Sequence, residues 1–260
     1  MKIAAVGDNC IDFYDSTQEA YPGGNPVNVA VYFVRQGGEA SYTGVVGSDA
    51  YGELMLKSMA AKGVDVSHVE KAEGSTAVTH VELVNGERVF GKYDEGVLKD
   101  FRLTQEQIDF LCTHDLVVTA LWGNVHDNLA QIHSRGVKTA FDAATAPECR
   151  AAQTAVVSSD YFFYSAKADT PELREQMKRL WEMGPKLVTA TLGSDGSIAY
   201  DGEKFTTFGI VPCEVVDTLG AGDSYISGFL KGILEEKPLT ECMRMGAENA
   251  SITLGYFGAW

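Results

Sequence analysis

Short apolar runs alternate with helical patterns along most of this chain. Six runs are rich in β-branched or aromatic residues, as strands buried on both faces of a sheet are: residues 3–6, 40–46, 116–120, 139–141, 161–164 and 187–191. Apolar positions at helical spacing lie between them, at residues 26–36, 51–61, 104–111, 128–135, 171–183 and 223–234. This alternation predicts a mostly parallel central sheet with helices on both faces, a three-layer α/β/α fold.

Three of the predicted helices begin with residues that favour a helix N-terminus. Asp49 precedes one helix, and Thr104 has the capping-box spacing to Gln107 at the start of another. Thr170 followed by Pro171 places a proline at the first helical position of a third. These signals support the predicted helix starts.

One region departs from the alternation of strand and helix. Residues 75–93 alternate polar and apolar side chains around Asn85-Gly86, the strongest short-range signal for an antiparallel β-hairpin. Together with residues 12–20, the hairpin could form a small sheet over the ends of the parallel strands, where α/β proteins bind ligands. We therefore expect a single domain over residues 1–260, with a discontinuous β-sheet lid at about residues 12–20 and 75–97.

Composition and charge argue against several classes of protein. A hydrophobic content of 45% in 260 residues can bury a large core, while a net charge of −15 without any basic stretch argues against nucleic-acid binding. No apolar run reaches the length of a membrane span, so we expect a soluble, cytoplasmic protein without a membrane partner. The cysteines lack the spacing of a zinc or disulfide framework and are predicted to be reduced packing residues: Cys10, Cys112, Cys149, Cys213 and Cys242.

The segment Asp-Thr-Leu-Gly-Ala-Gly-Asp at residues 217–223 offers the groups that phosphoryl transfer requires. Gly220, Ala221 and Gly222 are small enough for backbone N–H groups to approach a phosphate, next to the anion-favouring N-terminus of a helix. The carboxylate of Asp223 could accept the proton of an acceptor hydroxyl. By itself, a Gly-Ala-Gly turn followed by Asp is equally typical of an ordinary strand-to-helix turn.

The longer run DTLGAGDSYISGF at residues 217–229 resembles the carboxy-terminal signature of the ribokinase-like, PfkB family of carbohydrate and nucleoside kinases. The resemblance implies a ribokinase-like fold and transfer of the γ-phosphoryl group of ATP to a sugar hydroxyl. It also implies Asp223 as general base, with Gly220, Ala221 and Gly222 as the anion hole. A dinucleotide-binding oxidoreductase fits less well, since residues 7–12 contain a single glycine. A sugar-binding module without turnover stays open as an alternative.

Two further elements resemble the family's sugar site. Residues 23–30, GGNPVNVA, match a GGxxxNxA pattern in which glycines admit a substrate and an asparagine presents both donor and acceptor to a polyol. After the first strand, the family places a carboxylate that accepts bonds from substrate hydroxyls, at Asp12 or alternatively at Asp8 or Asn9. The expected substrate-binding residues are Asp8, Asn9, Asp12, Gly23, Gly24, Asn28, Arg88, Tyr93 and Trp122.

Residues 189–197, TATLGSDGS, resemble the strand and turn that line the family's ATP site. The resemblance places Thr191, Gly193 and Gly196 at the nucleotide and Asn249 beside the adenine. A plain β-turn is the alternative for this stretch taken alone.

The family's motif for ordering Mg²⁺ is missing from this sequence. Many relatives carry an Asn-x-x-Glu motif that orders Mg²⁺ and its waters, but residues 164–169, YSAKAD, contain neither residue in place. We expect Mg²⁺ to arrive with ATP, with Asp142 and Asp169 as candidates for ordering its water shell. Activation by a monovalent cation stays open, and its site would use backbone carbonyls near residues 215–218 and the carboxy-terminal loop.

Residues 7–12, 88–97 and 256–260 resemble family members that act on Amadori products. This resemblance implies that the acceptor is the 6-hydroxyl of fructoselysine, whose tail carries ammonium and carboxylate groups. Fructose, another fructosamine or another small sugar are the alternatives, and a homodimer through the lid is expected as in some relatives. Charged lid residues would face the tail: Asp94, Glu95, Arg88 and Lys92.

Overall fold

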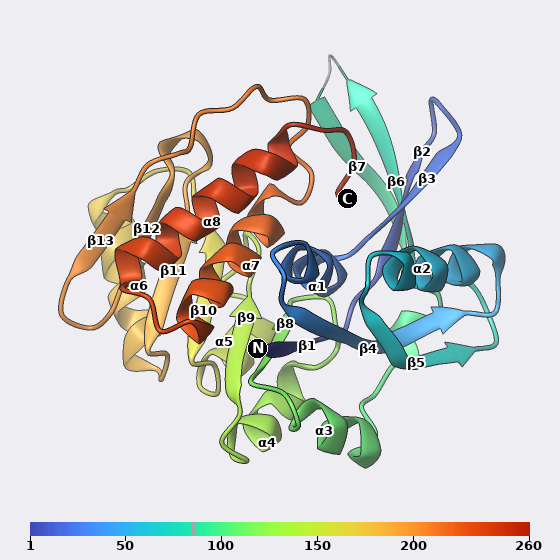
Figure 1. Ribbon diagram of the computed structural model, residues 1–260, viewed down its shortest axis with the longest axis horizontal. Coiled ribbons are helices and arrows are strands. Elements are labelled where there is room, and N and C mark those ends of the chain that lie inside the picture. The colour runs from blue at the N-terminus through green and yellow to red at the C-terminus, as the bar shows by residue number, and fades with distance from the viewer. Residues whose placement is uncertain (85–86) are drawn as a thin grey trace.

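A computed structural model describes residues 1–84 and 87–260 and shows a large twisted sheet flanked by helices (Figure 1). The strands of this sheet are β1 (Lys2–Val6), β4 (Glu39–Gly47), β5 (Asp65–Ala72), β8 (Leu116–Ala120), β9 (Lys138–Asp142), β10 (Tyr161–Ser165), β11 (Leu187–Thr191), β12 (Ser197–Tyr200) and β13 (Phe205–Phe208). Within the described residues it has nine strands, in the order β13-β12-β11-β10-β9-β8-β1-β4-β5. The pairs β11–β12 and β12–β13 are antiparallel, and all other neighbouring strands of this sheet run parallel. The predicted mostly parallel sheet is therefore confirmed.

Helices cover both faces of the large sheet. They are α1 (Asn25–Arg35), α2 (Ala50–Ala61), α3 (Gln105–Leu111), α4 (Leu129–His133), α5 (Arg150–Val156), α6 (Pro171–Glu182), α7 (Ala221–Leu234) and α8 (Leu239–Leu254). Helices α1, α2, α7 and α8 contribute to one hydrophobic cluster, while α3 to α6 contribute to two others. The molecule therefore has the predicted helix, sheet and helix layers (Figure 1).

Successive residues of the central strands face opposite helix layers. In β1, Ile3 and Ala5 join the cluster that contains Phe33 of α1, whereas Ala4 and Val6 join the cluster that contains Ile132 of α4. A strand alternates its side chains between the two faces, so the residues of β1 from Ile3 to Val6 are all buried and all apolar. Each large apolar side chain buried in this way contributes roughly 1.5–3 kcal/mol.

The predicted helix starts are present. The carboxylate of Asp49 accepts a hydrogen bond from the backbone N–H of Gly52 at 2.8 Å. Thr104 and Gln107 form both bonds of the capping box, and Pro171 lies in the first turn of α6. The helix predicted at residues 128–135 is shorter: residue 128 belongs to a 3₁₀ turn (His126–Asn128), and α4 ends at His133, before Gly136 with its φ of 82°.

A second, four-stranded sheet stands beside the large one (Figure 1). Its strands are β2 (Cys10–Tyr14), β3 (Glu19–Gly23), β6 (Val78–Val84) and β7 (Glu87–Asp94), in the order β3-β2-β6-β7. Strands β6 and β7 are antiparallel as the hairpin pattern predicts, whereas β2 and β6 run parallel. The predicted turn residues Asn85 and Gly86 lie outside the described residues.

Two cysteines depart from the packing role predicted for all five. The five thiols are free, but Cys213 is exposed and Cys10 lines the cavity described below. In the described part of the chain, no helix has the length and apolar character needed to cross a membrane.

Candidate functional site

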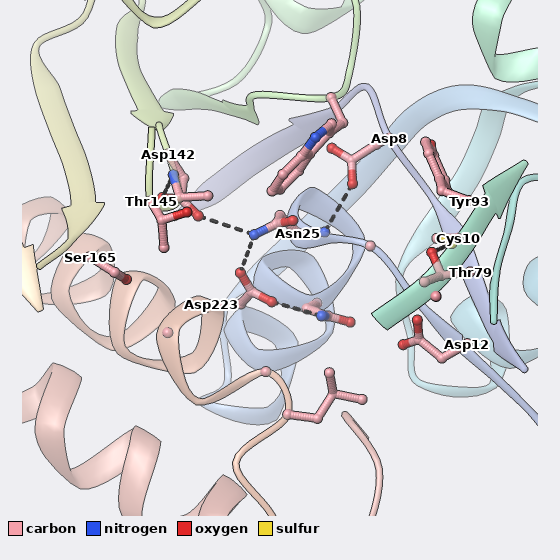
Figure 2. Close-up of a pocket in the computed structure, with 18 residues that line it drawn as sticks. Asp8, Cys10, Asp12, Asn25, Thr79, Tyr93, Asp142, Thr145, Ser165 and Asp223 are labelled. Carbon is pink, nitrogen blue, oxygen red and sulfur yellow. Dashed lines mark hydrogen bonds between the residues drawn. The ribbon is translucent and has the colours of Figure 1, made fainter. Parts of the chain in front are cut away.

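A cavity of about 530 Å³ lies between the ends of the large sheet's strands and the small sheet (Figure 2). Asp142 ends β9 and Ser165 ends β10, and both line it. Thr79 of β6 and Tyr93 of β7 line it from the small sheet. The carboxyl ends of parallel strands are the usual ligand site of an open α/β sheet, and the cavity occupies this position.

Asp223 lies in the first turn of α7 and is buried at the floor of the cavity. Both of its carboxylate oxygens accept hydrogen bonds from side-chain amides. Asn28 donates to Oδ2 at 2.7 Å and Asn25 donates to Oδ1 at 2.9 Å. The amide of Asn25 also donates to Oδ2 of Asp142 at 3.1 Å, so it lies between two carboxylates (Figure 2).

Burial shifts the protonation of the carboxylates in this cavity. The pKa of Asp223 is raised well above its ordinary value, first by burial and then by the negative charge of Asp142, while the amide of Asn28 opposes the rise. Burial also raises the pKa of Asp142 to about 6 and that of Asp8 to about 7. Strongly perturbed carboxylates in a cleft are typical of acid–base sites.

Gly220 and Gly222 line the cavity at the N-terminus of α7, where backbone N–H groups have no partner within the helix. Gly220 has φ of 71°, and a Cβ there would overlap the hydroxyl of Tyr32. A Cβ on Gly222 would meet no atom within 4 Å. Ala221 does not line the cavity, and its N–H donates to the carbonyl of Thr218 at 3.3 Å.

Asp217 fixes the loop that precedes α7. Its Oδ1 accepts a hydrogen bond from the N–H of Leu219 at 3.0 Å, and its Oδ2 accepts one from Gly258 at 2.8 Å. The carboxylate therefore ties the glycine-containing loop to the segment of residues 256–260.

The predicted sugar residues Asp8, Asp12, Gly24 and Asn28 all line the cavity. Gly24 has φ of 108°, and a Cβ there would lie 2.7 Å from the Cα of Asn9, so the entry to α1 requires glycine. Gly23 is buried, and a Cβ there would lie 2.9 Å from the Asp12 carboxylate.

Tyr93 and Trp122 also line the cavity, and Trp122 is 48% exposed. Gly91 and Tyr93 face the cavity from alternate positions of β7, so Lys92 and Asp94 point to the opposite face of that strand. Neither these two residues nor Glu95 lines the cavity, which corrects the expectation that they face the substrate tail. The side chain of Arg88 lies outside the described residues.

Two predicted ligand residues serve packing in this structure. Asn9 is fully buried behind the cavity, where its amide donates to the hydroxyl of Tyr42 at 2.9 Å and to the carbonyl of Val45 at 2.7 Å. Asn249 of α8 is buried and donates to the carbonyl of Ser224 in α7 at 2.7 Å. Neither side chain lines the cavity, and the amide N–H groups of both have protein acceptors.

The predicted nucleotide residues lie at the end of β11, next to the cavity and not on its lining. The hydroxyl of Thr191 lies 2.9 Å from that of Ser165, which does line the cavity. Gly193 faces open space, whereas a Cβ on Gly196 would overlap the carbonyl of Phe208, which gives Gly196 a turn role.

The two candidates for ordering Mg²⁺ differ in position. Asp169 forms a two-bond ion pair with Arg174, at 2.7 and 2.8 Å, and does not line the cavity. Asp142 lines the cavity beside Asp223. Among the described residues there is no cluster of three acidic, histidine or cysteine side chains that could hold a metal. A single carboxylate beside substrate phosphates fits Mg²⁺, which keeps several waters.

Sequence reasoning missed several residues of the site, above all Asn25. Its position directly after Gly24, at the start of a helix already assigned to substrate, is the signal that could have identified it. Cys10 and Thr79 were also missed; both line the cavity, and their Sγ and Oγ1 atoms lie 3.0 Å apart.

Comparison with known proteins gives matches over the whole chain. Residues 2–260 match the family model described as pfkB family carbohydrate kinase. The fructoselysine 6-kinase of Shigella flexneri is 43% identical over 258 residues, covering 99% of each chain. The fructosamine kinase FrlD of Bacillus subtilis is 33% identical, covering all of this chain and 93% of its own length.

The fold has a close match among solved structures. Arabidopsis thaliana ribokinase complexed with ribose and ATP superposes with a TM-score of 0.85 and 20% identity, covering 99% of this chain and 93% of its own. This likeness confirms the expected ribokinase-like fold.

Proposed function

This chain belongs to the pfkB family of carbohydrate kinases, and we propose that it transfers the γ-phosphoryl group of ATP to the 6-hydroxyl of fructoselysine. The name and the 43% identity of the Shigella flexneri relative support this acceptor. A kinase for another fructosamine is the second candidate, supported by the name of the Bacillus subtilis relative.

The acidic lining of the cavity is the main structural observation that supports fructoselysine as the acceptor. Four carboxylates line it, and the described lining residues include no lysine or arginine: Asp8, Asp12, Asp142 and Asp223. Fructoselysine brings ammonium groups into this field, whereas free fructose is neutral. A charge-assisted hydrogen bond contributes roughly 1.5–3 kcal/mol, enough for a preference of about tenfold or more.

Asp8 is the carboxylate best placed to distinguish the two sugars. It is 4% exposed, and one of its oxygens accepts a hydrogen bond from the backbone N–H of Asn25 at 3.1 Å. Its other oxygen has no hydrogen-bond partner in the part of the chain that the structure describes. A buried acceptor without a donor is costly, and an ammonium group of the substrate would supply the donor.

The remaining residues divide the work of the reaction. Asp12 and Asn28 would hold the sugar hydroxyls, while Asp223 accepts the proton from the attacking hydroxyl. Backbone N–H groups at Gly220 and Gly222 would stabilise charge on the transferring group. Asp142 is the lining carboxylate that would hold a Mg²⁺ ion supplied with ATP, and that ion would help to neutralise charge on the phosphoryl groups.

We also propose that the protein acts in the cytoplasm on small-molecule substrates, without nucleic-acid or membrane partners. A homodimer through the small sheet and activation by a monovalent cation stay predictions.

The experiment is an ADP-release assay on wild type and Asp8→Asn with fructoselysine, a second fructosyl amino acid, glucoselysine, psicoselysine, fructose and ribose. We expect kcat/KM for fructoselysine to exceed that for fructose by at least about tenfold, and Asp8→Asn to reduce this ratio. Equal values on free fructose would contradict the acceptor, and an absence of sugar-dependent ADP release would contradict the kinase activity. Equal rates on a second fructosyl amino acid would favour the broader fructosamine kinase.

A further inference from the structure

Trp260 and Asp223 are connected through a single side chain, Asn28. The indole Nε1 of Trp260 donates to Oδ1 of Asn28 at 2.7 Å. The Nδ2 of the same asparagine donates to Oδ2 of Asp223, also at 2.7 Å. Trp260 does not line the catalytic cavity, so it contacts the amide from the side away from the substrate.

The chemistry of the indole determines which way the amide points. An indole N–H can only donate, whereas an asparagine amide presents an acceptor oxygen on one side and a donor nitrogen on the other. With its oxygen held by Trp260, Asn28 must turn its nitrogen toward Asp223. A reversed amide would place its oxygen against the carboxylate, an arrangement that an ionised Asp223 disfavours.

We propose that Trp260 is a positioning residue, which keeps the amide of Asn28 turned toward Asp223 and so holds the base in the ionised form that accepts a proton. The inference rests on the assignment of Asp223 as base in the proposed function, but not on the identity of the sugar. Trp260 does not line the cavity, and its indole N–H donates to Asn28, through which it would act on Asp223.

The groups around Asp223 explain why this orientation matters. Asp142 and Asp8 both raise its pKa through their charge, in addition to the larger effect of burial. The amides of Asn28 and Asn25 are the hydrogen bonds that lower it. Losing one of two compensating donors leaves the base protonated over a wider range of pH.

The segment that carries Trp260 is anchored to the same site. The N–H of Gly258 donates to Asp217, which also binds the loop before α7. The carbonyl of Ala259 accepts hydrogen bonds from the hydroxyls of Tyr32 and, at 3.1 Å, of Tyr256. These contacts hold the backbone beside Trp260, so the indole has a fixed direction toward α1.

The test is the pH dependence of kcat in Trp260→Phe, which keeps an aromatic ring and removes the N–H. We expect kcat to fall about tenfold at pH 6 and to stay within about twofold of wild type at pH 8.5. Trp181→Phe is the matched control, because the Nε1 of Trp181 in α6 has no hydrogen-bond partner within the described residues. We expect its profile to match wild type.

A double-mutant cycle with Asn28→Ala keeps the inference testable if packing around Trp260 changes. The Asn28→Ala variant has no amide to orient and adds no charge beside Asp223, so adding Trp260→Phe should cause no further shift of the pH profile in that background. Equal loss at all pH values, or an unchanged profile, would show that Trp260 only packs. Thermal unfolding of each variant verifies that the protein is folded. Near-normal turnover of Asp223→Asn would instead remove the base assignment itself.

Discussion

The amide of Asn25 lies 2.9 Å from the carboxylate of Asp223, although 198 positions separate the two residues. The same amide donates to Asp142, so a single neutral side chain stands between two buried carboxylates that repel each other. The proposed role of Asp223 as general base requires its carboxylate to stay ionised in that environment.

Asp223→Asn tests the role of this carboxylate directly. We expect kcat to fall by roughly 10²–10⁴-fold, because asparagine cannot accept the proton of the attacking hydroxyl. Calorimetric titration should show that ATP and sugar still bind. Asp127→Asn is the control, since the Asp127 side chain is 81% exposed and should tolerate the same change. Turnover near that of wild type would exclude Asp223 as the base.

Asp8→Asn should change how stability depends on pH. Burial raises the pKa of Asp8 from 3.8 to about 7 in the folded protein. The folded chain therefore binds this proton more tightly than the unfolded chain, and wild type loses the associated stability as pH rises from about 4 to 7. Asparagine keeps the acceptor for the N–H of Asn25 and does not ionise.

Thermal unfolding between pH 4 and 8 measures this effect. We expect Asp8→Asn to gain stability over wild type as pH rises, with Tm higher by roughly 2–4 °C for each 1 kcal/mol. The difference should be small near pH 4, where folded Asp8 is protonated and unfolded Asp8 is about half protonated. A constant offset at all pH values would show that Asp8 carries no such shift.

Gly220→Ala and Gly222→Ala should separate stability from catalysis. At Gly220, φ is 71° and a Cβ would overlap the hydroxyl of Tyr32, so we expect a loss of stability of at least about 1–2 kcal/mol. At Gly222 a Cβ meets no atom and points to open space at the cavity, so the fold should be retained or slightly stabilised.

Kinetics of the same pair measure the anion site. Gly222→Ala should reduce kcat/KM for ATP, because a methyl group would stand where the phosphate approaches the helix N-terminus. Unfolding in denaturant and steady-state assays distinguish the two variants. Full activity in Gly222→Ala would contradict its place in the anion hole.

Asn9→Ala should act on stability and not on the affinity for substrate. The amide of Asn9 satisfies Tyr42 and the carbonyl of Val45 in the interior, and its loss leaves the Val45 carbonyl unpaired at a cost of about 1–3 kcal/mol. Asn28→Ala is the comparison, since Asn28 lines the cavity and its loss should raise KM for the sugar. A raised KM for the sugar with an unchanged Tm in Asn9→Ala would show that Asn9 contributes to substrate binding and not to packing.

The strands that apolar runs predicted were the ones buried between two helix layers. Strand β5, with the sequence DVSHVEKA, was missed because it lies at the sheet edge, where polar side chains reach solvent. Its backbone pairing with β4 makes it a strand, and no local pattern records that pairing. Helix α5 was also missed: like α3 it has only seven residues, but it begins after Cys149 and lacks the capping-box signal that Thr104 gives α3.

Local motifs predicted the groups that share one turn of chain, such as Asp223 with Gly220. They could not show that the amide of Asn249 donates a hydrogen bond to the carbonyl of Ser224, because that contact joins two helices. The positions of Lys92 and Asp94 were predictable in principle: alternation along β7 places them opposite Tyr93. Asp142 lies at the cavity because it ends β9, and the neighbouring parallel strands end at the same edge of the sheet.

The acidic lining of the cavity has a consequence for the end of the catalytic cycle. Phosphorylation adds close to two negative charges to the sugar, which then lies among Asp8, Asp12, Asp142 and Asp223. The proposed substrate carries ammonium groups that these carboxylates attract, and its product carries the same groups together with a phosphate that the carboxylates repel. We therefore expect weak product inhibition and turnover that persists as product accumulates.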